Sequence, residues 1–210
     1  AMITVASMDG HGYFNFGLCA AATEAMVQKA KKVIVEVNPN MPRCLGGLGE
    51  AIHISDVDAI VEAPGIAIPT IPFVAGDEID AMIAKPIVEA IPDGATLQLG
   101  IGGLPNSVGA MIAKSDLKDL GFHTEMLVDA FYLMYKEGRL TNKAKRLNRN
   151  KGVYSFALGS QKLYDWIDDN PSLAAFPIDY VNDPAVIGQM DNFISINSCI
   201  EVDLFGQVSA

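Results

Sequence analysis

The stretch that decides the fold runs from Leu97 to Ala113 and reads LQLGIGGLPNSVGAMIA. Its first residues alternate as in a strand, three glycines follow, and apolar residues then recur at helical spacing. Pro105 stands where the helix is expected to begin, a position at which proline is well tolerated. A strand, a glycine turn and a helix in this order indicate one unit of an α/β sheet.

Strand and helix patterns alternate along the rest of the chain as well. This alternation favours mainly parallel sheets flanked by helices. We expect strands over 2–6, 32–37, 58–61, 96–99, 152–158, 193–196 and 200–204, and helices over 19–31, 77–90, 129–137 and 160–169. A further helix is expected from Pro105 onward.

The segment 63–76, APGIAIPTIPFVAG, carries three prolines and two glycines. This composition excludes a central strand or a helix interior and is typical of a linker. We therefore divide the chain into 1–62, the linker 63–76, and 77–210. Predicted strands lie at both ends of the chain, with no capping residue or connecting segment before the first. We therefore expect a piece of a longer polypeptide.

Composition excludes several classes of protein. Half of the 210 residues are hydrophobic and the net charge is −10, which argues against a nucleic-acid partner. The one basic cluster, 143–151, indicates either a solvated loop or a local anion-binding patch. No apolar run approaches the roughly 18 residues of a membrane span, so we expect no membrane contact.

Three scattered cysteines, Cys19, Cys44 and Cys199, lack the spacing of metal ligands or of a disulfide framework. Their number fits a reducing compartment, and we expect a cytoplasmic protein. The three histidines are isolated from one another, so no metal site is expected.

The glycine turn does not match either common nucleotide-binding motif. Pro105 occupies the last glycine position of G-x-G-x-x-G, and no Lys-Ser/Thr pair follows for a phosphate loop. Glycines nevertheless expose backbone N–H groups, and the start of a helix adds a positive dipole end. The turn therefore indicates a site for an anion or a developing oxyanion, or alternatively a turn whose glycines serve packing alone.

Glu125, between Thr124 and Met126, stands at the expected end of a strand. The carboxyl ends of strands are where α/β sheets place their sites. A carboxylate beside an oxyanion site can act as a covalent nucleophile, whereas the alternative is an ordinary exposed glutamate.

Five segments, in order along the chain, resemble the acetyl-CoA hydrolase/transferase family. The resemblance is greatest to the branch that contains 4-hydroxybutyrate and butyryl-CoA:acetate CoA-transferases. It implies a CoA-transferase fold of two similar domains, with 1–62 ending the first and 77–210 beginning the second. The matching segments are Ser7-Met8-Asp9 with 11–17 (HGYFNFG), 36–38 (EVN) with 40–43 (NMPR), the glycine turn, 123–126 (HTEM), and 196–208 (INSCIEVDLFGQV).

The resemblance also implies an activity, namely ping-pong transfer of coenzyme A between an acyl-CoA and a short-chain carboxylate. Glu125 matches the family's catalytic glutamate, which forms a glutamyl-CoA thioester. A coenzyme A thioester is then a substrate, no permanently bound cofactor is implied, and we expect a homo-oligomer. The turn residues that would hold coenzyme A or the oxyanion are Gly100, Gly102, Gly103, Leu104, Pro105 and Asn106.

Asn197 and His11 are further candidates for contact with substrate or coenzyme A. The chain departs from the family at Asn106, where relatives carry Asp, and at 128–130 (VDA), where many read SDG. Alternatives remain an acyl-CoA hydrolase on the same scaffold and a binding module without activity. A nicotinamide oxidoreductase is disfavoured because the dinucleotide motif is missing.

Overall fold

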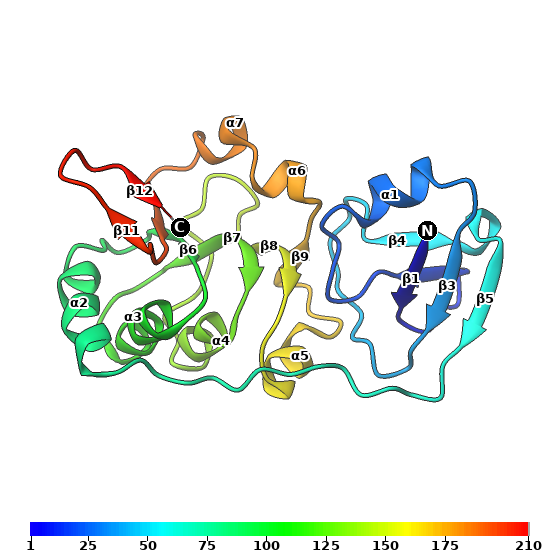
Figure 1. Ribbon diagram of the computed structural model, residues 1–210, viewed down its shortest axis with the longest axis horizontal. Helices are drawn as coiled ribbons and strands as arrows, with labels where there is room; N and C mark the ends of the chain where they lie inside the picture. Colours follow the sequence, from blue (N-terminus) through cyan, green and yellow to red (C-terminus); the bar gives the residue numbers. More distant parts are fainter. Residues whose placement is uncertain (210) are drawn as a thin grey trace.

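The computed structural model describes residues 1–209 and places them in two lobes (Figure 1). The N-terminal lobe contains a parallel three-stranded sheet of order β1-β3-β5 and a separate antiparallel pair, β2 and β4. Its elements are β1 (Met2–Val5), β2 (Tyr13–Asn15), α1 (Thr23–Lys29), β3 (Ile34–Val37), β4 (Ala51–His53), the 3₁₀ turn η1 (Ile54–Asp56) and β5 (Ala59–Glu62).

The C-terminal lobe is built on a five-stranded sheet of order β10-β6-β7-β8-β9, in which every neighbouring pair is parallel. A short antiparallel hairpin of β11 and β12 follows this sheet. The strands are β6 (Thr96–Leu99), β7 (Gly121–Leu127), β8 (Gly152–Ala157), β9 (Leu173–Ala175), β10 (Phe193–Ile196), β11 (Glu201–Val202) and β12 (Val208–Ser209). The helices are α2 (Glu78–Glu89), α3 (Gly103–Lys114), α4 (Asp129–Lys136), α5 (Gln161–Ile167), α6 (Ile178–Val181) and α7 (Pro184–Ile187).

Helices cover the two faces of this sheet unequally. The four longer helices, α2 to α5, lie along one face, and the single-turn helices α6 and α7 lie on the other (Figure 1). The main core forms on the first face, where Leu97 and Phe122 of the sheet pack with Val108 of α3 and Phe131 of α4. Because side chains alternate along a strand, the residues between these apolar ones face α6 and α7.

Backbone hydrogen bonds join the two lobes. Ala157 N–H of β8 donates to the carbonyl of Leu18 and Ala175 N–H of β9 to that of Leu45, each at 2.8 Å. The coil 63–76 runs along the second lobe, where Tyr164 Oη donates to the Pro69 carbonyl at 2.8 Å (Figure 1). The linker region therefore separates the two sheets in sequence but is packed against one of them in space.

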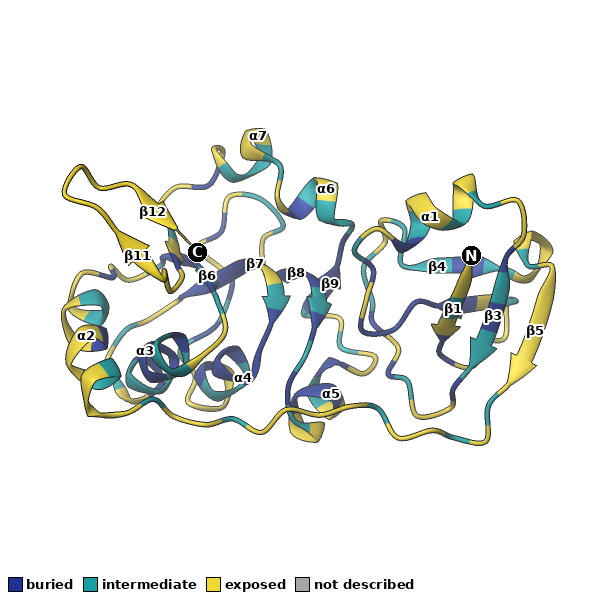
Figure 2. Cartoon of the chain, in the orientation of Figure 1, coloured by how far each residue is buried: buried dark blue, intermediate teal, exposed yellow. Residues whose placement is uncertain are grey.

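Element boundaries follow the sequence closely wherever a local signal exists. The strands 96–99 and 193–196 are present with the predicted bounds. Asp77 caps α2 reciprocally with Asp80, which explains why this helix begins where acidic residues cluster. The linker, β5 and the β11–β12 hairpin are largely exposed (Figure 2).

One helix prediction and one strand prediction were too long. The predicted helix 19–31 begins only at Thr23, because the N–H groups of Ala20 and Ala21 donate to the Ser155 carbonyl of the neighbouring sheet. The predicted strand 200–204 is reduced to Glu201–Val202, paired only with β12.

The basic segment 143–151 is not a uniformly solvated loop, because Lys145 is only 3% exposed. Its Nζ donates to the carbonyls of Phe122 and Lys151 at 2.8 and 2.7 Å, and burial lowers the pKa of Lys145 to about 7. Within residues 1–209, no helix has the length and apolar character needed to cross a membrane.

Candidate active site

The strand order of the larger sheet reverses at β6, which has β7 on one side and β10 on the other. Sheets of this type bind ligands beyond the carboxyl ends of the strands at such a switch point. The β6–β7 ladder consists of the pairs Thr96–Gly121 and Leu97–Phe122, whereas the β7–β8 ladder extends to Leu127. Space therefore opens between the carboxyl ends of β6 and β7.

A pocket of about 260 Å³ lies there, between the sheet and the helices α6 and α7. We call it the Glu125 pocket. It contains Glu125 and Asn197, two of the residues predicted from sequence. It is lined by Gln98, His123, Glu125, Val181, Asn182, Ile187, Phe193, Ser195 and Asn197.

Glu125 lies within β7, two residues before the end of the strand rather than beyond it, and its side chain is exposed. Asn182, the residue that ends α6, donates from Nδ2 to Glu125 Oε2 at 2.6 Å. No group among residues 1–209 donates a hydrogen bond to the other oxygen, Oε1. Asn182 thus holds one carboxylate oxygen in place, and the other has no hydrogen-bond donor in the part of the chain that the structure describes.

His123 ties α6 to the same strand two residues earlier. Its Nε2 lies 2.7 Å from the Val181 carbonyl, and because a carbonyl only accepts, Nε2 is assigned as the protonated nitrogen. Burial lowers the pKa of His123 to about 4, so the ring is neutral at pH 7. Hydrogen bonds from His123 and Asn182 together fix α6 against β7 and so support the orientation of Glu125.

Three polar side chains form a hydrogen-bonded network beside Glu125. Gln98 Nε2 donates to Asn197 Oδ1 at 3.0 Å, and Asn197 Nδ2 donates back to Gln98 Oε1 at 2.9 Å. Ser195 Oγ donates to Gln98 Oε1 at 2.5 Å and accepts from Asn197 Nδ2 at 3.1 Å. The network spans β6 and the end of β10, and it lines one side of the Glu125 pocket.

The glycine turn has the geometry of an anion site at the start of α3. Gly102 caps the helix with a φ of +111°, a conformation that favours glycine. Within residues 1–209, the N–H groups of Gly102, Gly103 and Leu104 donate no hydrogen bond, as is usual for the first turn of a helix. A Cβ at Gly103 would meet the Asp80 carboxylate, so glycine is also required there for packing.

The turn lines a second pocket of about 320 Å³, which we call the linker pocket. It lies between the linker residues 71–75 and the loops that follow β6, β7 and β8. Gly102, Gly103 and Asn106 line it together with Met126, whose side chain points to the opposite face of β7 from Glu125. Asn106 Nδ2 donates to the Val74 carbonyl at 2.8 Å, so this amide holds the linker over the turn.

The structure therefore brings Glu125 and Asn197 together, and it places most of the turn on the other side of β7. Gly100, the first glycine of the turn, lies next to the Glu125 pocket, because a Cβ there would lie 2.7 Å from Asn197 Oδ1. Pro105 is buried in the first turn of α3, and Leu104 packs against the core.

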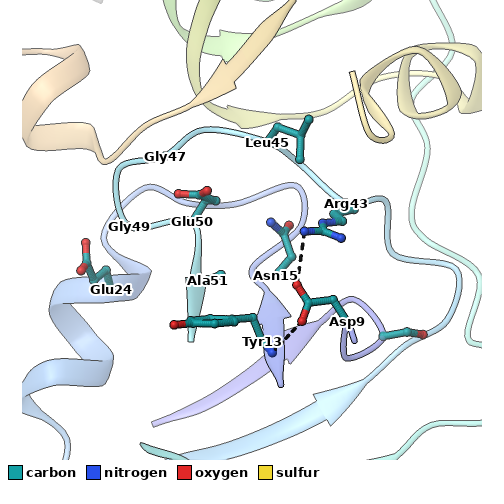
Figure 3. A pocket seen from close by; sticks show the side chains of 11 residues that line it. Asp9, Tyr13, Asn15, Glu24, Arg43, Leu45, Gly47, Gly49, Glu50 and Ala51 are labelled. Carbon is teal, nitrogen blue, oxygen red and sulfur yellow. Dashed lines mark hydrogen bonds and ion pairs between the residues drawn. The ribbon is translucent and has the colours of Figure 1, made fainter. Parts of the chain in front are cut away.

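His11 lies in the other lobe, in the exposed turn before β2, and lines neither pocket. Its backbone N–H donates to the Asp9 carboxylate at 2.8 Å. Asp9 belongs to a polar pocket of about 440 Å³, where it also accepts from the Tyr13 N–H and pairs with Arg43 at 3.3 Å (Figure 3). Backbone hydrogen bonds from Tyr13 and His11 lower the pKa of Asp9.

Sequence reasoning missed Asn182, Gln98 and Ser195. Gln98 and Ser195 each stand next to last in a short strand otherwise rich in apolar residues, and this polar position was the available signal. Asn182 follows a single-turn helix 57 residues after Glu125, and nothing local in the sequence connects the two.

An exposed glutamate whose carboxylate accepts a hydrogen bond from an amide near the carboxyl end of a parallel sheet can serve as the nucleophile of an acyl-transfer site. The model of the acetyl-CoA hydrolase/transferase N-terminal domain matches residues 1–72, and that of the C-terminal domain of the same name matches residues 159–210. The chain belongs to the acetyl-CoA hydrolase/transferase family.

Similar proteins cover the entire chain. It is 55% identical over 211 residues to the butyryl-CoA:acetate CoA-transferase of Anaerostipes caccae and 53% identical over 210 residues to a probable butyrate:acetyl-CoA coenzyme A-transferase of Syntrophomonas wolfei. These alignments cover 100% of this chain and 47% of each relative, so the chain spans about half the length of these relatives.

Solved structures show the same fold. The 4-hydroxybutyrate CoA-transferase of Porphyromonas gingivalis superimposes with a TM-score of 0.93 at 39% identity, over 99% of this chain and 52% of that one. RipA from Yersinia pestis gives a TM-score of 0.93 at 41% identity, over 99% of this chain and 47% of that one. The predicted α/β CoA-transferase fold with parallel sheets is confirmed.

Proposed function

We propose that this chain supplies the nucleophile of a CoA-transferase that exchanges coenzyme A between short-chain acyl-CoA thioesters and carboxylates. The observation that carries the proposal is the state of Glu125, which lines a pocket, with Oε2 held by Asn182 at 2.6 Å and Oε1 without a donor among residues 1–209. The names of three relatives include butyrate, butyryl-CoA, acetate and 4-hydroxybutyrate, and these names support short-chain substrates.

The reaction proceeds in two covalent stages. Glu125 Oε1 attacks the thioester carbonyl, the carbon–sulfur bond breaks, and coenzyme A leaves as thiolate from an acyl-glutamyl anhydride. The thiolate then attacks the glutamyl carbonyl, the original acid leaves as carboxylate, and a glutamyl-CoA thioester remains. A second carboxylate reverses these steps, so no proton or electron needs an external source.

Asn182 serves both stages through the same hydrogen bond. In the resting enzyme it orients the nucleophile. In the anhydride Oε2 becomes the glutamyl carbonyl oxygen, and the Asn182 amide then stabilises the negative charge that forms there under attack by thiolate.

The glycine turn has a separate part in this proposal. Gly102 and Gly103, whose N–H groups donate no hydrogen bond among residues 1–209, line the linker pocket, and the lining of this pocket is mainly apolar. We assign this side of β7 to the coenzyme A arm. Binding energy gained far from the reacting carbon can then position the thioester against Glu125.

The test is to trap the adduct on Glu125 in the full-length protein. Butyryl-CoA is added, borohydride reduces the thioester, and the peptide that contains Glu125 is weighed after digestion. We expect a reduced side chain at Glu125 and ping-pong kinetics with acetate. In Glu125→Gln the trapped peptide should be absent and transfer should fall by at least about 10³-fold, because the nucleophile is removed.

Glu62→Gln is a matched control, since this exposed glutamate ends β5 in the other lobe. It should leave both trapping and transfer unchanged. An unmodified Glu125 peptide with turnover continuing after borohydride would refute the covalent mechanism. Coenzyme A release that does not depend on acetate would indicate an acyl-CoA hydrolase.

A further inference from the structure

The helix that presents the Asn182 amide to the nucleophile is a single turn, α6 (Ile178–Val181). A helix of one turn is not stable by itself, so its position depends on contacts with the rest of the molecule. The Ile178 N–H donates to the carbonyl of Ala21 in the N-terminal lobe at 3.0 Å. Tyr180 Oη donates to Asn148 Oδ1, also at 3.0 Å. A third anchor lies at the other end of the helix.

This third anchor is the hydrogen bond of 2.7 Å from His123 Nε2 to the Val181 carbonyl. The last carbonyls of a helix have no partner within the helix, so the imidazole satisfies an acceptor that the helix leaves open. The carbonyl belongs to the peptide unit that joins Val181 to Asn182. Because a peptide unit is planar, holding its oxygen also holds the plane that contains the nitrogen and Cα of Asn182.

His123 and Glu125 hold the end of α6 from the same strand. They stand two residues apart in β7, so their side chains lie on the same face of the sheet. His123 donates to the carbonyl of residue 181, and Glu125 accepts from the side chain of residue 182 at 2.6 Å. The position of α6 against β7 is therefore fixed at two points, one of which is the nucleophile itself.

The surroundings of His123 leave its ring little freedom. The residue is 1% exposed, and its ring centroid lies 6.2 Å from that of Tyr180 and 6.4 Å from that of Phe193. Its Nδ1 has no hydrogen-bond partner among residues 1–209, so the bond to the Val181 carbonyl is the polar contact that orients the ring. Without this donor the carbonyl would be left unpaired in a buried place, and α6 would have to move to satisfy it.

Resting on the proposed function, we infer that His123 is a positioning residue for the transfer reaction and that it acts through Asn182. The Asn182 amide can orient Glu125 and stabilise the developing oxyanion at no further cost only while its peptide unit is held in advance. The coenzyme A arm is assigned to the linker pocket, on the opposite face of β7. Loss of the His123 donor should therefore lower kcat and leave KM for the acyl-CoA unchanged.

The test measures transfer from butyryl-CoA to acetate by the full-length protein. In His123→Leu we expect kcat to fall about tenfold, with KM for butyryl-CoA changed by less than about twofold. His123→Gln should stay within about threefold of wild type, because its amide reaches the Val181 carbonyl and can donate to it. His123→Asn carries the same amide on a side chain one methylene shorter and should be as slow as His123→Leu.

A double-mutant cycle shows whether His123 acts through the amide. Asn182→Ala should lower kcat about 10²-fold, because it removes the donor to the oxyanion. His123→Leu combined with Asn182→Ala should be no slower than Asn182→Ala alone, since no amide is left to position. A merely structural defect in His123→Leu would lower kcat equally in both backgrounds, and this result would overturn the proposal.

Tyr180→Phe is the matched control, because it removes another hydrogen bond of α6 and keeps the ring beside His123. It should change kcat by less than about twofold. A fall equal to that in His123→Leu would mean that α6 is held as a whole and would refute the specific role of His123, as would equal rates in His123→Gln and His123→Asn. Unchanged kcat in His123→Leu with an intact Glu125 adduct refutes the positioning role alone, whereas a wild type that forms no adduct refutes the proposed function as well.

Discussion

His123 shows how one buried side chain sets the acid sensitivity of the site. Burial lowers the pKa of His123 from 6.5 to about 4, so between these values the unfolded chain binds a proton that the folded chain does not. The free energy of unfolding therefore falls as the pH falls through this window. We expect a loss of up to about 3 kcal/mol, complete near pH 4 and absent above pH 6.5. Urea unfolding at several pH values measures it.

His123→Gln is the control for this slope, because an amide can still donate to the Val181 carbonyl but does not titrate. Its free energy of unfolding should change much less between pH 6.5 and 4. The pKa values of Asp9 and Asp58 are lowered from 3.8. Protonation of these two carboxylates therefore lowers the free energy of unfolding only below pH 3.8, outside the window. Equal slopes in the two proteins would contradict the assignment.

At the same scale, the sequence indicated those candidate site residues whose chemistry is conspicuous by itself. Glu125 between Thr124 and Met126 and the glycines of the turn could be singled out without a structure. Asn182 could not, because its contact with Glu125 arises only when α6 packs against β7 and brings its amide to the carboxylate. That the turn and Glu125 line different pockets was equally invisible, since it depends on which face of β7 each side chain takes.

At the scale of elements, the close approach of α3 and α4 depends on Gly109. A Cβ at this position would lie 2.5 Å from Ala130 Cβ and 3.3 Å from its Cα. Gly109→Ala should therefore push the helices apart and destabilise the protein by about 1–3 kcal/mol, despite the better helix propensity of alanine. Urea unfolding measures the change.

The companion variant Ala130→Gly removes the methyl group that the new side chain would meet. The double variant should recover part of the loss, with a coupling energy of about 1 kcal/mol in the cycle. Independent, additive effects would show that the two helices do not meet through these residues.

Element boundaries were predictable where the deciding forces are local. Asp77 and Ser160 cap their helices with their own side chains, and both starts were located to within one residue. The predicted helix 19–31 failed because a distant strand competes for its first N–H groups, with Ser155 accepting from Ala20 and Ala21. Helical periodicity carries no information about such a partner.

At the scale of the molecule, the two lobes are held together by contacts that no pattern in the sequence indicates. The proline-rich linker suggested two units, yet Leu45 and Leu18 extend the larger sheet by backbone hydrogen bonds at 2.8 Å. Cys44 lies fully buried between the lobes, and burial raises the pKa of its thiol to about 12. The two hydrogen bonds join backbone atoms, which every sequence shares, and so leave no compositional signal.

Gly46 provides the test of this junction, because a Cβ there would meet the carbonyl oxygen of Ala175. Gly46→Ala should separate the 43–46 segment from β9 and break the Ala175–Leu45 hydrogen bond, since backbone atoms cannot move aside cheaply. The smaller core of the N-terminal lobe then unfolds first.

Trp166, the single tryptophan, reports on the C-terminal lobe by fluorescence, whereas circular dichroism reports on both lobes. We expect the two unfolding curves to coincide in wild type and in Gly10→Ala, where the added methyl meets nothing within 4 Å, and to separate in Gly46→Ala. Coincident curves with an unchanged midpoint in Gly46→Ala would mean that the lobes do not depend on this junction for cooperative folding.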